Sequence, residues 1–117
     1  MDWNYIAGFF DGEGCVHLAL ANRINKTRRT WYPTISCPIL NTNRIVLEEI
    51  QKFIDMGTIQ KTFFKSKKRK QGYILVIKKQ DHVKRFIKEL LSRCIVKHTE
   101  LFVAKEELEF IMKNKPP

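Results

Sequence analysis

The ten residues from Tyr5 to Gly14, YIAGFFDGEG, constrain this chain more than any other stretch of it. Residues 3–10 contain no run of β-branched side chains and are apolar nearly all round, which predicts a short helix that is buried on every side. Ala7 and Gly8 leave part of that helix almost without side chains. Another backbone could therefore approach the helix closely at that point.

Two carboxylates stand at the exit of this predicted helix. Gly12 and Gly14 are expected to end it, because glycine readily adopts the conformations that terminate helices. Asp11 and Glu13 alternate with these glycines. The sequence therefore predicts a buried helix with small residues on one face and two acidic side chains at its C-terminal end, where the chain changes direction.

The composition predicts one globular domain spanning residues 1–117 that binds a polyanion. The chain is 44% hydrophobic and carries a formal net charge of +10. A charge of this sign favours nucleic acid as partner, before an anionic membrane surface. No apolar run is long enough to span a bilayer and no secretory signal is recognisable, so a membrane partner is not expected. The three cysteines lack the spacing of a zinc site, which is typical of reduced cysteines in an intracellular protein.

The apolar periodicity changes between helical and alternating along the chain. The expected order is a helix at 3–10, strands at 15–22 and 31–40, a helix at 44–55, strands at 58–65 and 73–79, a helix that Asp81 caps, and a last helix after Lys97. Two hairpins covered by helices form an antiparallel α+β sheet with one packed face and one open face. Both hairpin tips are basic, and a β-ribbon fits the major groove of a duplex.

The stretch Ile6–Gly14 closely resembles the motif that defines the LAGLIDADG homing endonucleases. The predicted αββαββα order is similar to that family's fold, in which a saddle-shaped antiparallel sheet binds DNA. Members with a single motif act as homodimers, and this chain carries one copy. The resemblance implies a site-specific, intron-encoded hydrolase that makes a metal-dependent double-strand break in a long pseudo-palindromic DNA target. Its partners would be double-stranded DNA and a second copy of the chain.

The resemblance also implies the residues of the active site. Glu13 matches the catalytic, metal-binding acid, the backbone carbonyl of Gly12 is the expected second ligand, and the ion would be Mg²⁺ or Mn²⁺. Lys97 matches the family's lysine before the final helix, where a cation could polarise the attacking water. It could instead be a solvated lysine at a helix start. Asp11 could bind metal, but hydrogen bonding that closes the helix end is the preferred role.

A homodimer would bring two copies of the first helix together across a two-fold axis. The residues expected in that interface are Tyr5, Ala7, Gly8 and Asp11. The family also places a polar residue, often Gln, near the end of the second strand, where this chain has Pro38, Ile39 and Leu40. The polar side chains that could take that role are Asn41, Asn43 and Arg44.

Strand parity predicts which side chains meet DNA. If Val16, Leu18 and Leu20 face the helices, the residues between them face the duplex. Over the first three strands this set is Cys15, His17, Ala19, Ala21, Arg23, Thr30, Tyr32, Thr34, Ser36, Thr58, Gln60 and Thr62. Phosphate contacts are expected from Arg28, Arg29, Lys65, Lys67, Lys68, Arg69 and Lys70. The run at 65–70 could also be an ordinary solvated loop.

Two other functions remain open from sequence alone. The first is a non-cleaving nucleic-acid-binding relative, either an intron RNA maturase or a decayed endonuclease, which the apolar end of the second strand favours. The second is a dimeric interaction module with incidental charge. We expect the protein inside the cell, with the DNA of its host genome or organelle.

Overall fold

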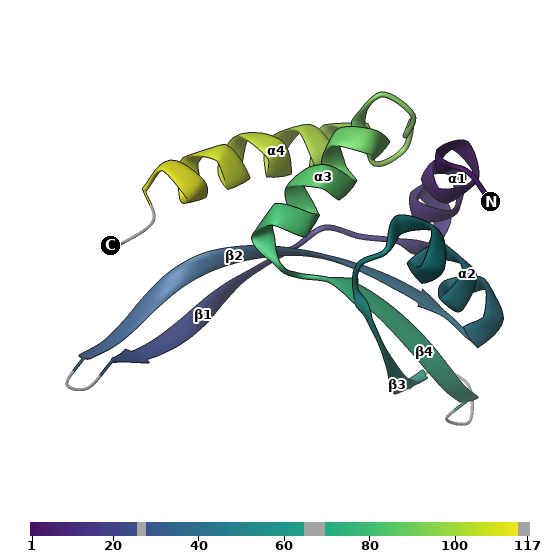
Figure 1. Ribbon diagram of the computed structural model, residues 1–117, viewed down its shortest axis with the longest axis horizontal. Helices are drawn as coiled ribbons and strands as arrows, with labels where there is room; N and C mark the ends of the chain where they lie inside the picture. The colour runs from purple at the N-terminus through teal and green to yellow at the C-terminus, as the bar shows by residue number, and fades with distance from the viewer. Residues whose placement is uncertain (26–27, 65–69, 115–117) are drawn as a thin grey trace.

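The computed structural model describes the backbone of residues 1–25, 28–64 and 70–114, and the side chains of those residues outside 23–30 and 63–70. Figure 1 labels its elements. They are α1 (Trp3–Glu13), β1 (His17–Asn25), β2 (Arg28–Asn41), α2 (Arg44–Ile54), β3 (Thr58–Phe64), β4 (Lys70–Ile77), α3 (Gln80–Leu91) and α4 (His98–Lys113). The predicted order of elements and the α+β fold class are confirmed.

The four strands form a single antiparallel sheet in the order β1-β2-β4-β3. The long strand β2 makes this possible, since its first part pairs with β1 and its last five residues, from Cys37 to Asn41, pair with β4. The two hairpins are therefore joined at the middle of the sheet. Their far ends diverge, and the sheet arches between them (Figure 1).

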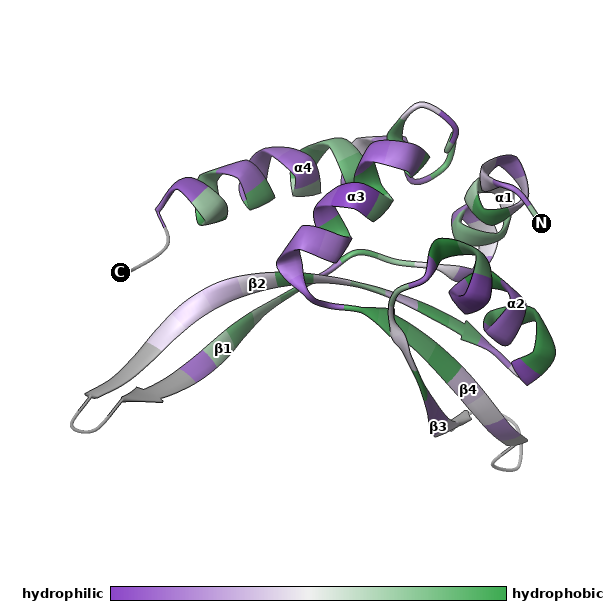
Figure 2. Ribbon diagram, viewed as in Figure 1, coloured by the Kyte–Doolittle hydropathy of each residue, from purple (hydrophilic) through white to green (hydrophobic). Residues whose placement is uncertain are grey.

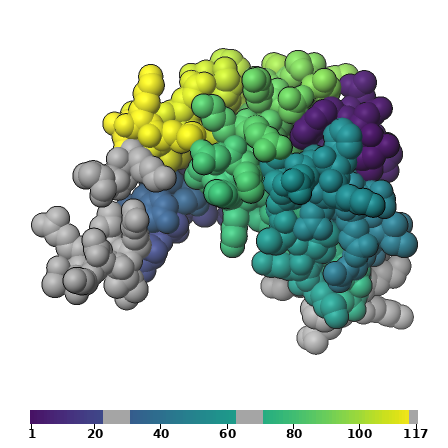
Figure 3. Space-filling model, in the orientation of Figure 1, coloured from purple at the N-terminus to yellow at the C-terminus, as the bar shows by residue number. Residues whose placement is uncertain are grey.

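All four helices lie on one side of this arch. The ribbon coloured by hydropathy shows them above the sheet, each mixing apolar and polar residues (Figure 2). On the opposite side the molecule is hollowed between its two hairpin lobes (Figure 3). The sheet therefore has one packed face and one open face, as the alternating sequence pattern predicts.

Short polar side chains set the starts of the first two helices. Asp2 Oδ1 accepts a hydrogen bond from the backbone N–H of Tyr5 at 2.8 Å, and Asn43 Oδ1 accepts one from Val46 at 3.2 Å. Both satisfy N–H groups that have no partner inside the helix. The predicted cap at Asp81 is wrong, because α3 begins one residue earlier, at Gln80, and Asp81 lies in its first turn.

Gln80 instead connects α3 to the sheet by two hydrogen bonds to the backbone of β2. Its Nε2 donates to the carbonyl of Ile35 at 2.9 Å, and its Oε1 accepts from the Ile35 N–H at 3.2 Å. These two bonds pair the backbone N–H and carbonyl of Ile35, which lies before the part of β2 that pairs with β4. The amide side chain thereby substitutes for a neighbouring strand.

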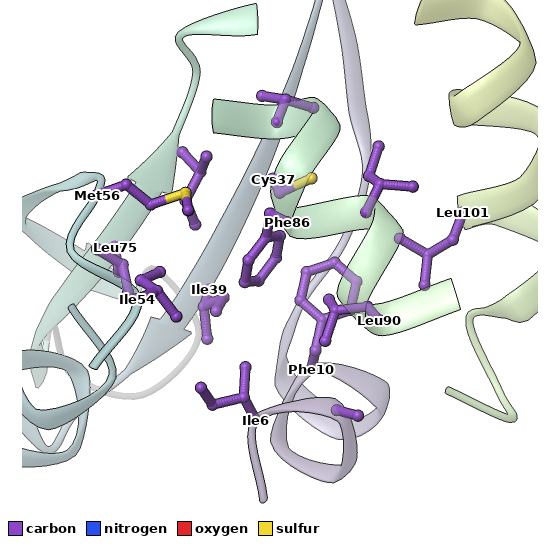
Figure 4. Packing of buried hydrophobic residues seen from close by; sticks show 14 of the residues in the cluster. Ile6, Phe10, Cys37, Ile39, Ile54, Met56, Leu75, Phe86, Leu90 and Leu101 are labelled. Carbon is purple, nitrogen blue, oxygen red and sulfur yellow. The ribbon is translucent and has the colours of Figure 1, made fainter. Parts of the chain in front are cut away.

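The core is continuous from α1 to α4 and is drawn in Figure 4. The ring of Phe10 meets that of Phe86 edge to face, with centroids 5.6 Å apart, and Trp3 packs against Phe86 at 6.0 Å. Ile6 and Phe10 are fully buried. The N-terminal helix is therefore a core element, as its apolar composition predicts.

The structure extends α1 to Glu13, three residues beyond the predicted end. Gly12 lies inside the helix and does not end it, which corrects the sequence prediction. Gly14 ends it, donating its N–H to the carbonyl of Phe10 at 2.9 Å and pairing with Ile39 of β2. A side chain at residue 14 would overlap the buried ring of Phe10.

We expect Gly14→Ala to destabilise the fold by about 1–3 kcal/mol, because the added methyl group forces the Phe10 ring out of its place against Phe86. Urea denaturation followed by circular dichroism measures this change. Glu49→Ala, at an exposed position of α2, is the control. It should change the free energy of unfolding by no more than about 0.5 kcal/mol, because substitutions on the exposed surface are usually close to neutral. Equal stability of Gly14→Ala and the parent would contradict this role of Gly14.

Candidate active site and nucleic-acid interface

The C-terminus of α1 presents oxygen ligands to solvent. Glu13 is exposed there, and Gly12 is exposed immediately before it. The last carbonyl groups of a helix have no partner within it, and they carry its partial negative charge. No basic residue lies in the last turn of α1. A carboxylate, a backbone carbonyl and the negative end of a helix are the kinds of group that a hard cation prefers.

Asp11 does not share this exposed position. Its Oδ2 accepts a hydrogen bond from the N–H of Ile95 at 2.9 Å, and its Oδ1 accepts one from the N–H of Lys97 at 3.0 Å. Partial burial acts to raise the pKa of the carboxyl, but the hydrogen bonds from the 95–97 backbone outweigh it and lower the pKa. These contacts favour the hydrogen-bonding role of Asp11 over metal binding. They connect the end of α1 to the loop before α4, a partner that the sequence did not reveal.

Lys97 occupies the residue before α4 and is partly buried. Its side chain lies within electrostatic reach of Cys15, the residue that follows the α1 exit. Burial raises the pKa of the Cys15 thiol, the carboxylate of Glu100 raises it further, and Lys97 lowers it. The structure thus places Lys97 and Glu100 near Cys15, and sequence reasoning missed Glu100.

The outer face of α1 differs from the predicted one. Ala7 is only 2% exposed and belongs to the core of its own chain, so its side chain is not available for a dimer interface. Gly8 and Gly12 are exposed four residues apart, and no described atom lies within 4 Å of a methyl group placed on either. Tyr5, 49% exposed, lies one turn before Gly8. The helix face with the smallest residues is therefore formed by Gly8 and Gly12. Their spacing of four residues, about one helical turn, is the sequence feature that could have indicated this.

The register confirms the predicted strand parity. Leu18 stands opposite the buried Ile35 on the helix-covered face, so His17 and its partner Ser36 lie on the open face. The same alternation puts Ala19, Ala21, Tyr32, Thr34, Thr58, Gln60 and Thr62 on the open face. Cys15 precedes β1 and is tied to β2 by its N–H, which donates to the carbonyl of Pro38 at 3.1 Å.

Several predicted contacts cannot be compared in the same way. Lys65, Lys67, Lys68 and Arg69 lie outside the described residues. Arg23, Arg28, Arg29, Thr30 and Lys70 have described backbones only; in the ladder Arg23 pairs with Thr30. Their roles at the phosphates stay predictions.

The three candidates for the polar role near the end of β2 are engaged elsewhere. Asn41 Oδ1 accepts from the N–H of Asn43 at 2.8 Å, and Asn43 caps α2. Arg44 Nε pairs with Glu48 at 2.7 Å, and its guanidinium lies over the ring of Tyr73. All three side chains organise the start of α2. The hydrogen bonds described for them do not lead toward Glu13.

Within the described ranges, no three His, Cys, Asp or Glu side chains come close enough to hold a metal ion together. In the same ranges, none of the helices combines the length and apolar character that crossing a membrane requires.

Comparison with known proteins agrees with this architecture. Residues 6–96 match the family model described as LAGLIDADG endonuclease, and the chain therefore belongs to that family. The homing endonuclease I-TnaI superposes with a TM-score of 0.78 at 21% identity, over 97% of this chain and 75% of its own. I-CvuI, solved in complex with its target, superposes with a TM-score of 0.76 at 16% identity, over 97% of this chain and 69% of its own. I-SmaMI, bound to cleaved DNA, gives 0.74 at 16% identity, over 98% of this chain and 38% of its own. No curated protein sequence matches the chain.

We expect Asp11→Ala to lower the free energy of unfolding by about 1–2 kcal/mol, because two hydrogen bonds to a carboxylate are lost. The same variant should increase hydrogen exchange at the Ile95 and Lys97 amides, measured by mass spectrometry on peptides covering 92–98. Asn43→Ala is the control, since it removes a cap of similar strength at α2. Unchanged exchange at residues 95–97 in Asp11→Ala would show that the carboxylate does not hold this loop.

Proposed function

We propose that this chain is a site-specific DNA endonuclease that works as a homodimer and makes a double-strand break. The observation that carries the proposal is the C-terminus of α1, where the exposed Glu13 and Gly12 follow a helix that has a second exposed glycine, Gly8, one turn earlier. Two such helices packed together would bring two Glu13 carboxylates close to the two-fold axis. Each would serve one strand of the duplex, as a pseudo-palindromic target requires.

The donor atoms fit a hard divalent cation, Mg²⁺ or Mn²⁺. Mg²⁺ prefers oxygen ligands, retains several waters and needs only one or two protein carboxylates, which matches Glu13 with the Gly12 carbonyl. Such an ion activates water and offsets charge on the phosphate. Structures of the relative I-CvuI were solved with DNA in Ca or in Mg, the latter with the DNA uncleaved. Lys97 would add a fixed positive charge near the same phosphate.

DNA would occupy the open face of the arch. The formal net charge of +10 favours a polyanion, and the helices leave this face uncovered (Figure 3). Polar side chains such as Thr34, Gln60 and Thr62 lie there, and a β-ribbon fits the major groove. Homing endonucleases act on genomic DNA, so we expect the protein inside the cell, in the compartment that holds its target.

We expect the parent protein to cut a subset of a randomised duplex library in Mg²⁺, and Glu13→Gln to reduce the cleavage rate about a hundredfold or more. Glutamine keeps the shape of the side chain but removes the charge that holds the ion. Sequencing both ends of the cut products identifies the target and the stagger. Glu106→Gln, at an exposed position of α4, is the control and should cleave like the parent.

Either of two results would count against this function. If Glu13→Gln cleaves as fast as the parent, Glu13 is not the metal ligand. If the parent binds library members tightly but releases no cut products, the protein is a non-cleaving nucleic-acid-binding relative.

We expect Gly8→Leu to convert the dimer to a monomer, because the larger side chain separates the two α1 helices. Sedimentation velocity measures the change, and circular dichroism verifies that the variant folds. Lys88→Leu introduces the same side chain at an exposed position of α3 and is the control. A Gly8→Leu protein that remains dimeric would show that α1 does not form the interface.

A further inference from the structure

The centre of the open face is apolar, which the sequence analysis did not anticipate. Leu40 of β2 stands opposite Ile74 of β4, and Pro38 stands opposite Val76. These four residues form two adjacent cross-strand pairs on one face. We call them the central apolar patch.

The register assigns this patch to the open face. Ile39 and Leu75, which alternate with the patch residues, form the neighbouring pair and are fully buried beneath the helices. The patch residues are partly exposed, and none of them belongs to the hydrophobic core or to the residues packed against it. The strand β4 is therefore apolar on both faces from Ile74 to Ile77.

An antiparallel sheet with one solvated face normally alternates apolar and polar residues. A group of large apolar residues at the middle of the open face indicates that a partner covers them. Polar side chains flank the patch on the β3 side, where Thr58 pairs with Val76 and Gln60 pairs with Ile74. The surface thus combines hydrogen-bonding groups with a small apolar centre.

We propose that the central apolar patch reads the 5-methyl groups of thymine in the major groove of the target, an inference that rests on the proposed DNA-binding function. The net charge of +10 favours a polyanion, and thymine presents an apolar group at the edge of the major groove. Threonine and glutamine beside the patch can contact neighbouring base edges. The face therefore recognises thymine by apolar contact and other bases by hydrogen bonds.

The patch also lies near the catalytic end of the molecule. Pro38 accepts the hydrogen bond from Cys15, and the Gly14–Ile39 bridge adjoins both patch residues of β2. Glu13 is the next residue along the chain from Gly14. The thymines read in this way should be those of each half-site nearest the cleaved phosphates.

The test uses Glu13→Gln as background, so that binding is measured without cleavage. Duplexes are selected from a randomised library, and each thymine of the selected target is replaced by deoxyuridine, which removes only the methyl group. We expect affinity, measured by fluorescence anisotropy, to fall about fourfold for each methyl group that the patch buries. The affected positions should cluster toward the centre of the target.

A second substitution assigns the effect to the patch. In Val76→Thr, which keeps the shape of the side chain, the penalty for deoxyuridine should shrink at one position in each half-site. Leu20→Thr is the matched control, because Leu20 is 67% exposed on the opposite face, and it should leave the penalty unchanged.

Three results would overturn the inference. A target whose fully deoxyuridine-substituted form binds as tightly as the thymine form would show that methyl groups are not read. A shift in oligomeric state of Val76→Thr, with the deoxyuridine penalty unchanged, would reassign the patch to a contact between protein chains. A library from which no duplex is enriched would overturn the proposed function itself, and the inference with it.

Discussion

The whole structure depends on α1, which packs into the core on one side and has two exposed glycines on the other. The inner face of α1 places Phe10 against Phe86 and Ile6 in the core, which fixes the helix relative to the sheet. Gly14 then lets the chain pass under the Phe10 ring and pair with β2. On the outer face, Gly8 and Gly12 have no side chain that would keep a second helix away. The position of Glu13 is therefore set by the core packing of α1, by Gly14 and by the hydrogen bonds of Asp11 to the 95–97 loop.

The fold could be predicted from the sequence because its signals are local. The change from helical to alternating apolar periodicity indicated the strands, and short polar residues such as Asn43 indicated a helix start. The alternation of side chains along each strand distinguished the open face of the sheet from the packed one. The end of α1 was misplaced because glycine usually terminates helices, whereas here Gly14 does so and Gly12 stays helical. Packing against Phe10 decides between the two glycines, and that contact cannot be read from spacing.

The candidate site was predicted less completely. Its long-range contacts could not be predicted from the sequence. The carboxylate of Asp11 accepts hydrogen bonds from the N–H groups of Ile95 and Lys97, more than eighty residues away. The burial of Ala7 depends on which side of α1 meets the core. The central apolar patch was hidden because a continuous apolar strand can also be buried on both faces. Only the pairing of Leu40 with Ile74 shows which side remains open.

We propose that each of two α1 termini acts on one strand of the duplex. A mixed dimer of one parent chain and one Glu13→Gln chain, purified by two different affinity tags, separates the contributions of the two termini. With the target labelled on both strands, we expect cleavage of a single strand, seen as nicked duplex on native gels and as one product on denaturing gels. A mixed dimer that cuts both strands at the parent rate would show that one Glu13 is sufficient for both strands.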